Sequence, residues 1–242
     1  MLAWWARSEE PGTTRTMYVR ESGRSTGEHW GHNRMGGARD ATTKAVCAKC
    51  NNGWMNDLDN ELRTLGSQLI KGRTVRLTKG KQASLARWAM KTILMLQLTH
   101  PRQGRFVIPP EDYRQFGTTR QPDDGTLMWT GHMEPPGKRG GPTLAFVEYR
   151  CDEVHWDESL VSRVGLDNAL ACTGYSASLR VGYCLTAVLK TGSPILAAKS
   201  VSTNPRHWTA IWPAFGTRVW PPLTHQPMVG LPPFRVGLRP PK

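Results

Sequence analysis

The sequence predicts an α+β fold in which two helices are followed by a mostly antiparallel β region. Between residues 53 and 98, apolar side chains recur at three- and four-residue steps, which is typical of helices that bury one face. After Gly117 the apolar repeat changes to every second residue, and stretches rich in Gly and Pro such as residues 134–142 separate the segments. With 242 residues and 38% hydrophobic content, the chain can bury one substantial core or two small ones.

The predicted helices cover residues 53–70, 78–98 and 109–117. In the first, five apolar residues form one stripe and the acidic side chains lie in its first half, where negative charge suits the helix dipole. Thr78 is a suitable N-cap for the second, which is apolar on most of its circumference. Its Trp88 is interpreted as a packing residue, as is Trp54 of the first stripe. The stripe comprises Trp54, Leu58, Leu62, Leu65 and Leu69.

The predicted strands cover residues 15–21, 126–133, 143–149 and 176–189. Within the last segment, Gly182 indicates a bulge or a bend that divides it. The segments 207–213 and 218–222 combine tryptophan with proline. Such a segment either closes the edge of a sheet or stacks on the bases of single-stranded nucleic acid, and we favour edge closure.

The net charge of +13 is unevenly distributed along the chain. Residues 1–61 carry eight basic and eight acidic side chains, whereas residues 62–110 carry ten basic side chains and no acidic one. Residues 168–242 carry eight basic side chains and again no acid. Acid-free blocks of this length attract phosphate backbones, so nucleic acid is the expected partner. The alternatives are a basic protein kept soluble by its charge and one bound to another anionic surface.

Composition also narrows the expected compartment. The longest apolar run, residues 93–98, is far shorter than the roughly 20 residues that cross a bilayer, and residues 1–20 lack the pattern of a signal peptide. The five cysteines are an odd number with one C-x-x-C pair, which favours metal binding in a reducing compartment over a disulfide framework. We therefore expect a cytoplasmic protein without a membrane partner.

Cys47 and Cys50 have the spacing with which two thiolates reach one Zn²⁺, and they make half of a tetrahedral site. Upstream, Glu28, His29 and His32 are the densest group of further potential ligands. Two chemical interpretations compete for this group. Either His29 and His32 complete a Cys₂His₂ zinc site, or His29 is a general base and Glu28 a ligand of a catalytic divalent ion. The third interpretation is surface histidines in a glycine-rich loop.

Residues 46–62 (VCAKCNNGWMNDLDNEL), residues 85–97 (LARWAMKTILMLQ) and the later IWP and WPP strings resemble small HNH-type proteins of actinobacteria and their phages. The resemblance spans most of the chain. C-x-x-C-N opening a helix is similar to the second zinc knuckle of HNH (His-Me finger) endonucleases, especially the recombination endonuclease VII branch. The resemblance implies a small ββα-type zinc knuckle with Cys47 and Cys50 as structural zinc ligands. It further implies that Asn51 and Glu28 hold a catalytic Mg²⁺ or Mn²⁺ and that His29 activates water.

The sequence departs from the HNH pattern at one point, because no cysteine precedes Cys47 where these enzymes carry a first C-x-x-C. Either His29 and His32 replace it, or the zinc site is incomplete, or the missing elements were lost before Met1. We expect an HNH-like region at residues 1–72 and a helix plus antiparallel β region at residues 73–242. The expected function is phosphodiester hydrolysis in nucleic acid, with DNA as the expected substrate, by an intact or degenerate nuclease; the alternative is a noncatalytic binding module. The expected phosphate-contacting residues are Arg73, Arg76, Lys79, Lys81, Arg87 and Lys91.

Overall fold

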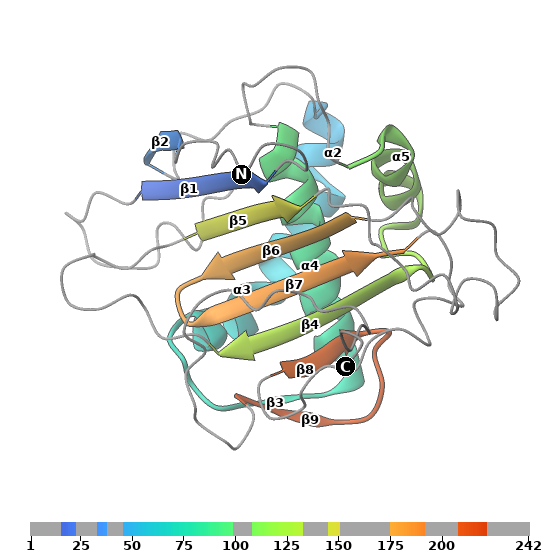
Figure 1. Ribbon diagram of the computed structural model, residues 1–242. Coiled ribbons are helices and arrows are strands. Elements are labelled where there is room, and N and C mark those ends of the chain that lie inside the picture. The colour runs from blue at the N-terminus through green and yellow to red at the C-terminus, as the bar shows by residue number, and fades with distance from the viewer. Residues whose placement is uncertain are drawn as a thin grey trace, which may run out of the picture.

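The computed structural model describes residues 16–22, 33–37, 46–98, 108–132, 145–150, 175–191 and 208–221. Within these ranges, helices cover one face of a large β-sheet, and a small two-stranded sheet lies beyond its last strand (Figure 1). The predicted α+β class is therefore confirmed.

The large sheet has seven strands in the order β2-β1-β5-β6-β7-β4-β8. Its neighbouring strands are antiparallel except for β1 and β5, which run parallel with Met17 opposite Ala145. The prediction of a mostly antiparallel region thus holds, and the parallel pair is the departure from it. The strands are β1 (Thr16–Ser22), β2 (Asn33–Gly37), β4 (Thr126–His132), β5 (Ala145–Arg150), β6 (Tyr175–Val181), β7 (Cys184–Lys190) and β8 (Trp208–Trp212).

Gly182 divides the predicted segment 176–189 into β6 and β7, as its sequence position indicates. The turn has two residues, Gly182 and Tyr183, and the φ angle of Gly182 is +57°. Glycine adopts this left-handed conformation without steric cost, and hairpin turns of this length favour it. The backbone N–H of Tyr183 donates to Ile70 O at 3.1 Å, which ties the turn to the end of a helix.

Three of the four described helices match the predicted ones, and the short helix α2 (Ala48–Asn52) is additional. Helices α3 and α4 lie together on one face of the sheet (Figure 1). The predicted stripe of α3 places Leu58, Leu62 and Leu65 in the interior. None of the described helices combines the length and apolarity needed to cross a membrane. The helices are α2 (Ala48–Asn52), α3 (Trp54–Ile70), α4 (Lys79–Leu98) and α5 (Pro110–Thr119).

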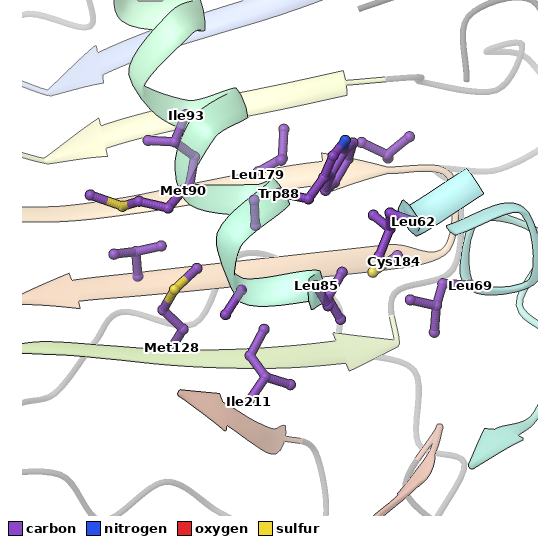
Figure 2. Packing of buried hydrophobic residues seen from close by; sticks show 14 of the residues in the cluster. Leu62, Leu69, Leu85, Trp88, Met90, Ile93, Met128, Leu179, Cys184 and Ile211 are labelled. Carbon is purple, nitrogen blue, oxygen red and sulfur yellow. The ribbon is translucent and has the colours of Figure 1, made fainter. Parts of the chain in front are cut away.

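The core lies between α3, α4 and the inner face of the sheet. Met90 and Ile93 of α4 belong to one buried cluster with Leu179 and Ile211 of the strands (Figure 2). Trp88 of α4 is in the same cluster, and its Nε1 donates to Asp59 of α3. The same cluster includes residues on both sides of position 72, so the described end of the predicted region 1–72 shares its core with the predicted region 73–242. The apolar side chains of the helices and of the sheet bury one another, and this removal of apolar surface from water is the main source of the stability of the fold.

The small sheet pairs β3 (Val75–Leu77) with β9 (Arg218–Trp220) in antiparallel register. Val75 lies opposite Trp220, and both are buried, with Trp220 fully so. Trp208, in the last strand of the large sheet, is also buried. The prediction that the Trp- and Pro-rich segments close sheet edges is therefore confirmed for the described residues.

Candidate nucleic-acid interface

The β3–β9 ribbon, defined as strands β3 and β9 together, exposes one basic face. Val75 and Leu77 point inward while Arg76 between them is exposed, as expected for a strand with one buried face. Val219 lies opposite Arg76 and is also exposed, at 44%. The inward side chains anchor the ribbon on the core, so the outward ones are presented from a fixed backbone.

Four of the six predicted phosphate-contacting residues are exposed on or beside this ribbon. Lys81 is anchored at its backbone, where its N–H donates to Thr78 Oγ1, and its Nζ donates to Arg76 O, both at 3.4 Å. The start of α4 and the end of β3 therefore form one continuous basic surface. The four exposed residues are Arg73, Arg76, Lys79 and Lys81.

The other two predicted residues are already paired inside the molecule. Lys91 is only 3% exposed and its Nζ donates to the Asp59 carboxylate, so it cannot reach a phosphate outside. Arg87 Nη2 donates to both carboxylate oxygens of Glu61, at 2.7 and 2.9 Å. Both therefore fall outside the basic surface, because their charges are neutralised by acids of α3 that lie far earlier in the sequence.

The β8–β9 loop adds an aromatic ring and a further cation to this surface. Phe215 is 51% exposed, and the Arg218 guanidinium lies over its ring, 4.7 Å from the centroid. A cation over an aromatic face is a favourable arrangement. Neither residue was among those expected from the sequence to contact nucleic acid.

The side chain of Gln82 in α4 holds the β8–β9 loop in place by hydrogen bonds. Its side chain is fully buried; its Nε2 donates to Leu77 O and Gly216 O, both at 3.0 Å, and its Oε1 accepts from Phe215 N at 3.1 Å. Gly216 has a φ angle of +60°, which glycine adopts readily. The loop that carries Phe215 is thus held to both β3 and α4 through the buried Gln82 side chain.

The charge around this surface has one sign. Residues 71–98 and 208–221 contain no acidic side chain, whereas Glu111 and Asp112 begin α5. In Figure 1 the β3–β9 ribbon and α5 lie at opposite ends of the molecule. Among the described residues, the ribbon and the start of α4 therefore carry cations without nearby acids in sequence, whereas α5 carries both signs.

The C-x-x-C turn lies at the start of helix α2. Cys47 is exposed and caps α2, and the backbone N–H of Cys50 donates to Cys47 Sγ at 3.4 Å. Hydrogen bonds from Cys50 lower the pKa of the Cys47 thiol, because they favour the thiolate. The thiolate is the form that binds metal.

Asn51 follows this turn, and its side chain is only partly satisfied. Its Nδ2 donates to Asn52 Oδ1 at 3.2 Å, while its Oδ1 is shielded from solvent and accepts no hydrogen bond. A buried amide oxygen without a donor is costly unless something else occupies the site. Two thiols and one amide oxygen thus fit part of the ligand sets that the sequence suggests.

The remaining predicted ligands fall outside the described residues. Glu28, His29 and His32 belong to residues 23–32, between β1 and β2. Among the described ranges, no group of three or more His, Cys, Asp or Glu side chains gathers around one point. The zinc site and the catalytic arrangement therefore stay predictions.

The C-x-x-C turn and the β3–β9 ribbon are separated by the length of α3. Three residues lie between Cys50 and the start of this helix and four lie between its end and β3, and its 17 residues span about 25 Å at about 1.5 Å each. Figure 1 shows α2 and the ribbon at opposite ends. A nucleic acid that contacts both must extend along the molecule.

Comparison with known proteins identifies no relative of this chain: no protein-family model matches it, and neither the curated proteins nor the solved structures give a significant match.

Proposed function

We propose that this protein binds nucleic acid through its phosphate backbone, using the basic surface of the β3–β9 ribbon. The observation that carries the proposal is the set of exposed cations on and beside the ribbon, with no acidic side chain in the segments that form it. Cations placed in this way neutralise phosphates and release their counterions without reading sequence. The proposed set is Arg73, Arg76, Lys79, Lys81 and Arg218.

A salt titration tests this proposal. If all five cations contact phosphates, the logarithm of the association constant for a duplex falls with the logarithm of salt concentration with a slope of about −4 to −5. Duplexes of unrelated sequence should bind with similar affinity. Salt-independent binding, or no binding at low salt, would overturn the proposal.

A second candidate function is metal-dependent phosphodiester hydrolysis by an HNH-like site. Two observations favour it: the hydrogen-bonded Cys47–Cys50 turn and the unpartnered, shielded Oδ1 of Asn51 directly after it. Cys47 and Cys50 would hold a structural zinc ion, with His29 and His32 as further ligands if the site is Cys₂His₂. Asn51 and Glu28 would hold a catalytic Mg²⁺ or Mn²⁺.

In this candidate the protein residues divide the work. His29 accepts the proton of the attacking water, and cannot then serve as a zinc ligand as well. A bound divalent ion supplies charge neutralisation at the scissile phosphate and the leaving oxygen. The cations of the β3–β9 ribbon position the backbone, about one α3 length from the reacting phosphate.

The two candidates are separated by a cleavage assay with Mg²⁺ or Mn²⁺, together with the zinc content of the purified protein. Loss of cleavage in both His29→Ala and Asn51→Ala, with retained circular dichroism, supports the enzyme; Asn56→Ala, an exposed asparagine of α3, is the matched control. Duplexes shorter than about 7–8 base pairs cannot span about 25 Å, since each base pair rises about 3.4 Å. Such short duplexes should therefore be cut poorly. Binding without cleavage by the wild type supports the noncatalytic module.

We also propose a reducing, cytoplasmic location. The three described cysteines, Cys47, Cys50 and Cys184, are free thiols, which suits a compartment where disulfides are rare. Labelling of the protein in intact cells with a compartment-restricted thiol reagent tests this location. Complete labelling from outside the cell would contradict it.

A further inference from the structure

We propose that Phe215 and Arg218 form a stacking platform for a base of single-stranded nucleic acid. The proposal rests on the nucleic-acid binding proposed above and names the form of nucleic acid that the ribbon prefers. It comes from an exposed aromatic ring on the β8–β9 loop, which hydrogen bonds hold beside the cations of the ribbon.

The exposure of Phe215 is the first step. Phenylalanine is among the residues most often buried, yet this ring keeps 51% of its surface accessible. Within the described ranges, Phe215 and Val219 are the large hydrophobic side chains that are exposed, and both belong to the segment 215–219, which overlaps the start of β9. The apolar surface is thus concentrated at one place on the basic end of the molecule.

The second step is the rigidity of the loop. Three hydrogen bonds from the buried Gln82 side chain hold Leu77, Phe215 and Gly216 at their backbones. The ring is therefore presented in a preorganised position, which lowers the entropy lost when a ligand binds. If the loop were flexible, the entropy lost on ordering it would offset part of the favourable free energy of stacking.

The third step is the chemistry of the occupant. Bases in a duplex are stacked on one another, whereas a single strand offers free base faces that stack on aromatic rings without sequence preference. The neighbouring Arg218 and Arg76 are exposed cations that suit the phosphates on either side of a stacked base. No acidic side chain lies in these segments, so none of their side chains repels phosphates. The exposed ring and its neighbouring cations therefore favour a single strand of nucleic acid over a protein surface with few acidic side chains.

The tryptophans of the same region do not offer this surface. Trp208 and Trp220 are buried, and Trp212 is partly buried with its Nε1 donating to Asp123 O at 3.3 Å. They support the strands from inside. Phe215, which lies between Trp212 and Trp220 in the sequence, is therefore the proposed stacking residue of this segment.

The test compares four ligands of equal length by fluorescence anisotropy at fixed salt: single-stranded DNA, single-stranded RNA, duplex DNA and an abasic single strand. The protein variants are the wild type, Phe215→Ala, Phe215→Tyr and Asn56→Ala, the last being a control whose exposed side chain lies on α3, outside the basic surface. We expect Phe215→Ala to weaken binding of base-containing single strands by about 5- to 100-fold. Duplex and abasic binding should change less than about 2-fold, and Phe215→Tyr should retain most of the affinity. The DNA and RNA arms show which strand the site prefers.

Three results would overturn the platform. An equal loss of affinity for abasic and base-containing strands in Phe215→Ala shows that the ring supports the loop instead of stacking. Unchanged single-strand affinity in Phe215→Ala, with normal salt-dependent binding, removes the platform but leaves the phosphate contacts intact. Concentration-dependent self-association that Phe215→Ala abolishes assigns the ring to a protein interface. Absence of salt-dependent binding to every ligand is different, because it overturns the proposed function itself.

Discussion

Asp59 of α3 and Lys91 of α4 form an ion pair inside the protein, and Trp88 Nε1 donates to the same carboxylate at 2.9 Å. Asp59 is 8% exposed and Lys91 is 3% exposed, so both charged groups are largely removed from solvent. Burial lowers the pKa of Lys91, and the nearby charge of Asp59 opposes this. The pair joins the two helices that cover the sheet, and each charge depends on the other.

Asp59→Ala should therefore lower the free energy of unfolding by about 3–5 kcal/mol, because it leaves a buried ammonium without its counterion. Urea unfolding followed by circular dichroism measures the change. Asn56→Ala, exposed on the same helix, should stay within about 0.5 kcal/mol of the wild type. Equal effects of the two substitutions would show that the pair is not a main support of this helix interface.

The same substitution should change the pH dependence of stability. Where the pKa of Lys91 in the folded protein lies below its unfolded value, the unfolded chain binds the proton more tightly. Stability then rises with pH between the two pKa values. Asp59→Ala removes the charge that opposes the effect of burial, so the pKa of Lys91 in the folded protein falls further below its unfolded value. The free energy of unfolding of Asp59→Ala should therefore rise more steeply with pH than that of the wild type, between neutral pH and about pH 10. Parallel pH profiles for the two proteins would contradict this explanation.

Gln82→Ala should destabilise the β8–β9 loop, because it leaves the buried Leu77 O and the partly buried Gly216 O and Phe215 N–H without their partner. A loss of about 1–3 kcal/mol is expected in chemical unfolding. Amide hydrogen exchange should accelerate at Phe215. Gln115→Ala removes hydrogen bonds that are exposed on α5 and serves as the control, with a change below about 0.5 kcal/mol. Unchanged exchange at Phe215 would mean that Gln82 does not hold the loop.

Gly182→Ala should lower the free energy of unfolding by more than about 2 kcal/mol. A left-handed backbone costs an alanine roughly 1–2 kcal/mol, and its Cβ would lie 2.4 Å from Ile70 O. Gly117→Ala is the matched glycine control, since a Cβ there meets nothing within 4 Å and the site is helical. Thermal unfolding should show Gly117→Ala stabilised by about 0.5–1 kcal/mol. If Gly182→Ala behaved like Gly117→Ala, the close packing of the β6–β7 turn on α3 would be refuted.

Cys47 should react with iodoacetamide at lower pH than an ordinary cysteine. Its pKa is lowered by hydrogen bonds from Cys50, whereas burial raises the pKa of Cys184. With EDTA present, the pH profile of Cys47 alkylation should have its midpoint below that of a cysteine in an unstructured peptide, measured in the same buffer. Peptide mass spectrometry assigns the modified residue, and Cys47→Ser removes the signal. A midpoint at or above that of the unstructured peptide, or faster labelling of Cys184, would contradict the geometry of the turn.

The sequence predicts the helices and the divided hairpin well, because these depend on local signals. The stripe on α3 and the glycine between β6 and β7 identify their elements directly. The pairing of β3 with β9 is not predicted, since each strand has three residues and the partners are far apart in the chain. The parallel pairing of β1 with β5 is missed for the same reason: register depends on contacts that no short window contains.

The candidate interface shows the same division. An acid-free block correctly places Arg76 and Lys79 on the surface, but it cannot show that Asp59 neutralises Lys91 from another helix. Phe215 carries no sequence signal stronger than its position between cations and tryptophans. Its exposure becomes visible only once the Gln82 hydrogen bonds fix the loop.

The most direct test of the central claim compares two double variants that remove the same charge. Arg76→Gln/Lys79→Gln removes two exposed cations of the basic surface, and Arg114→Gln/Arg120→Gln removes two exposed cations in and after α5, at the opposite end of the molecule (Figure 1). The salt dependence of duplex binding is measured for both. We predict that the magnitude of the logarithmic slope falls by about 2 in the first variant and stays within about 0.5 of the wild type in the second. Equal slopes in the two variants would contradict a phosphate-binding surface at the β3–β9 ribbon.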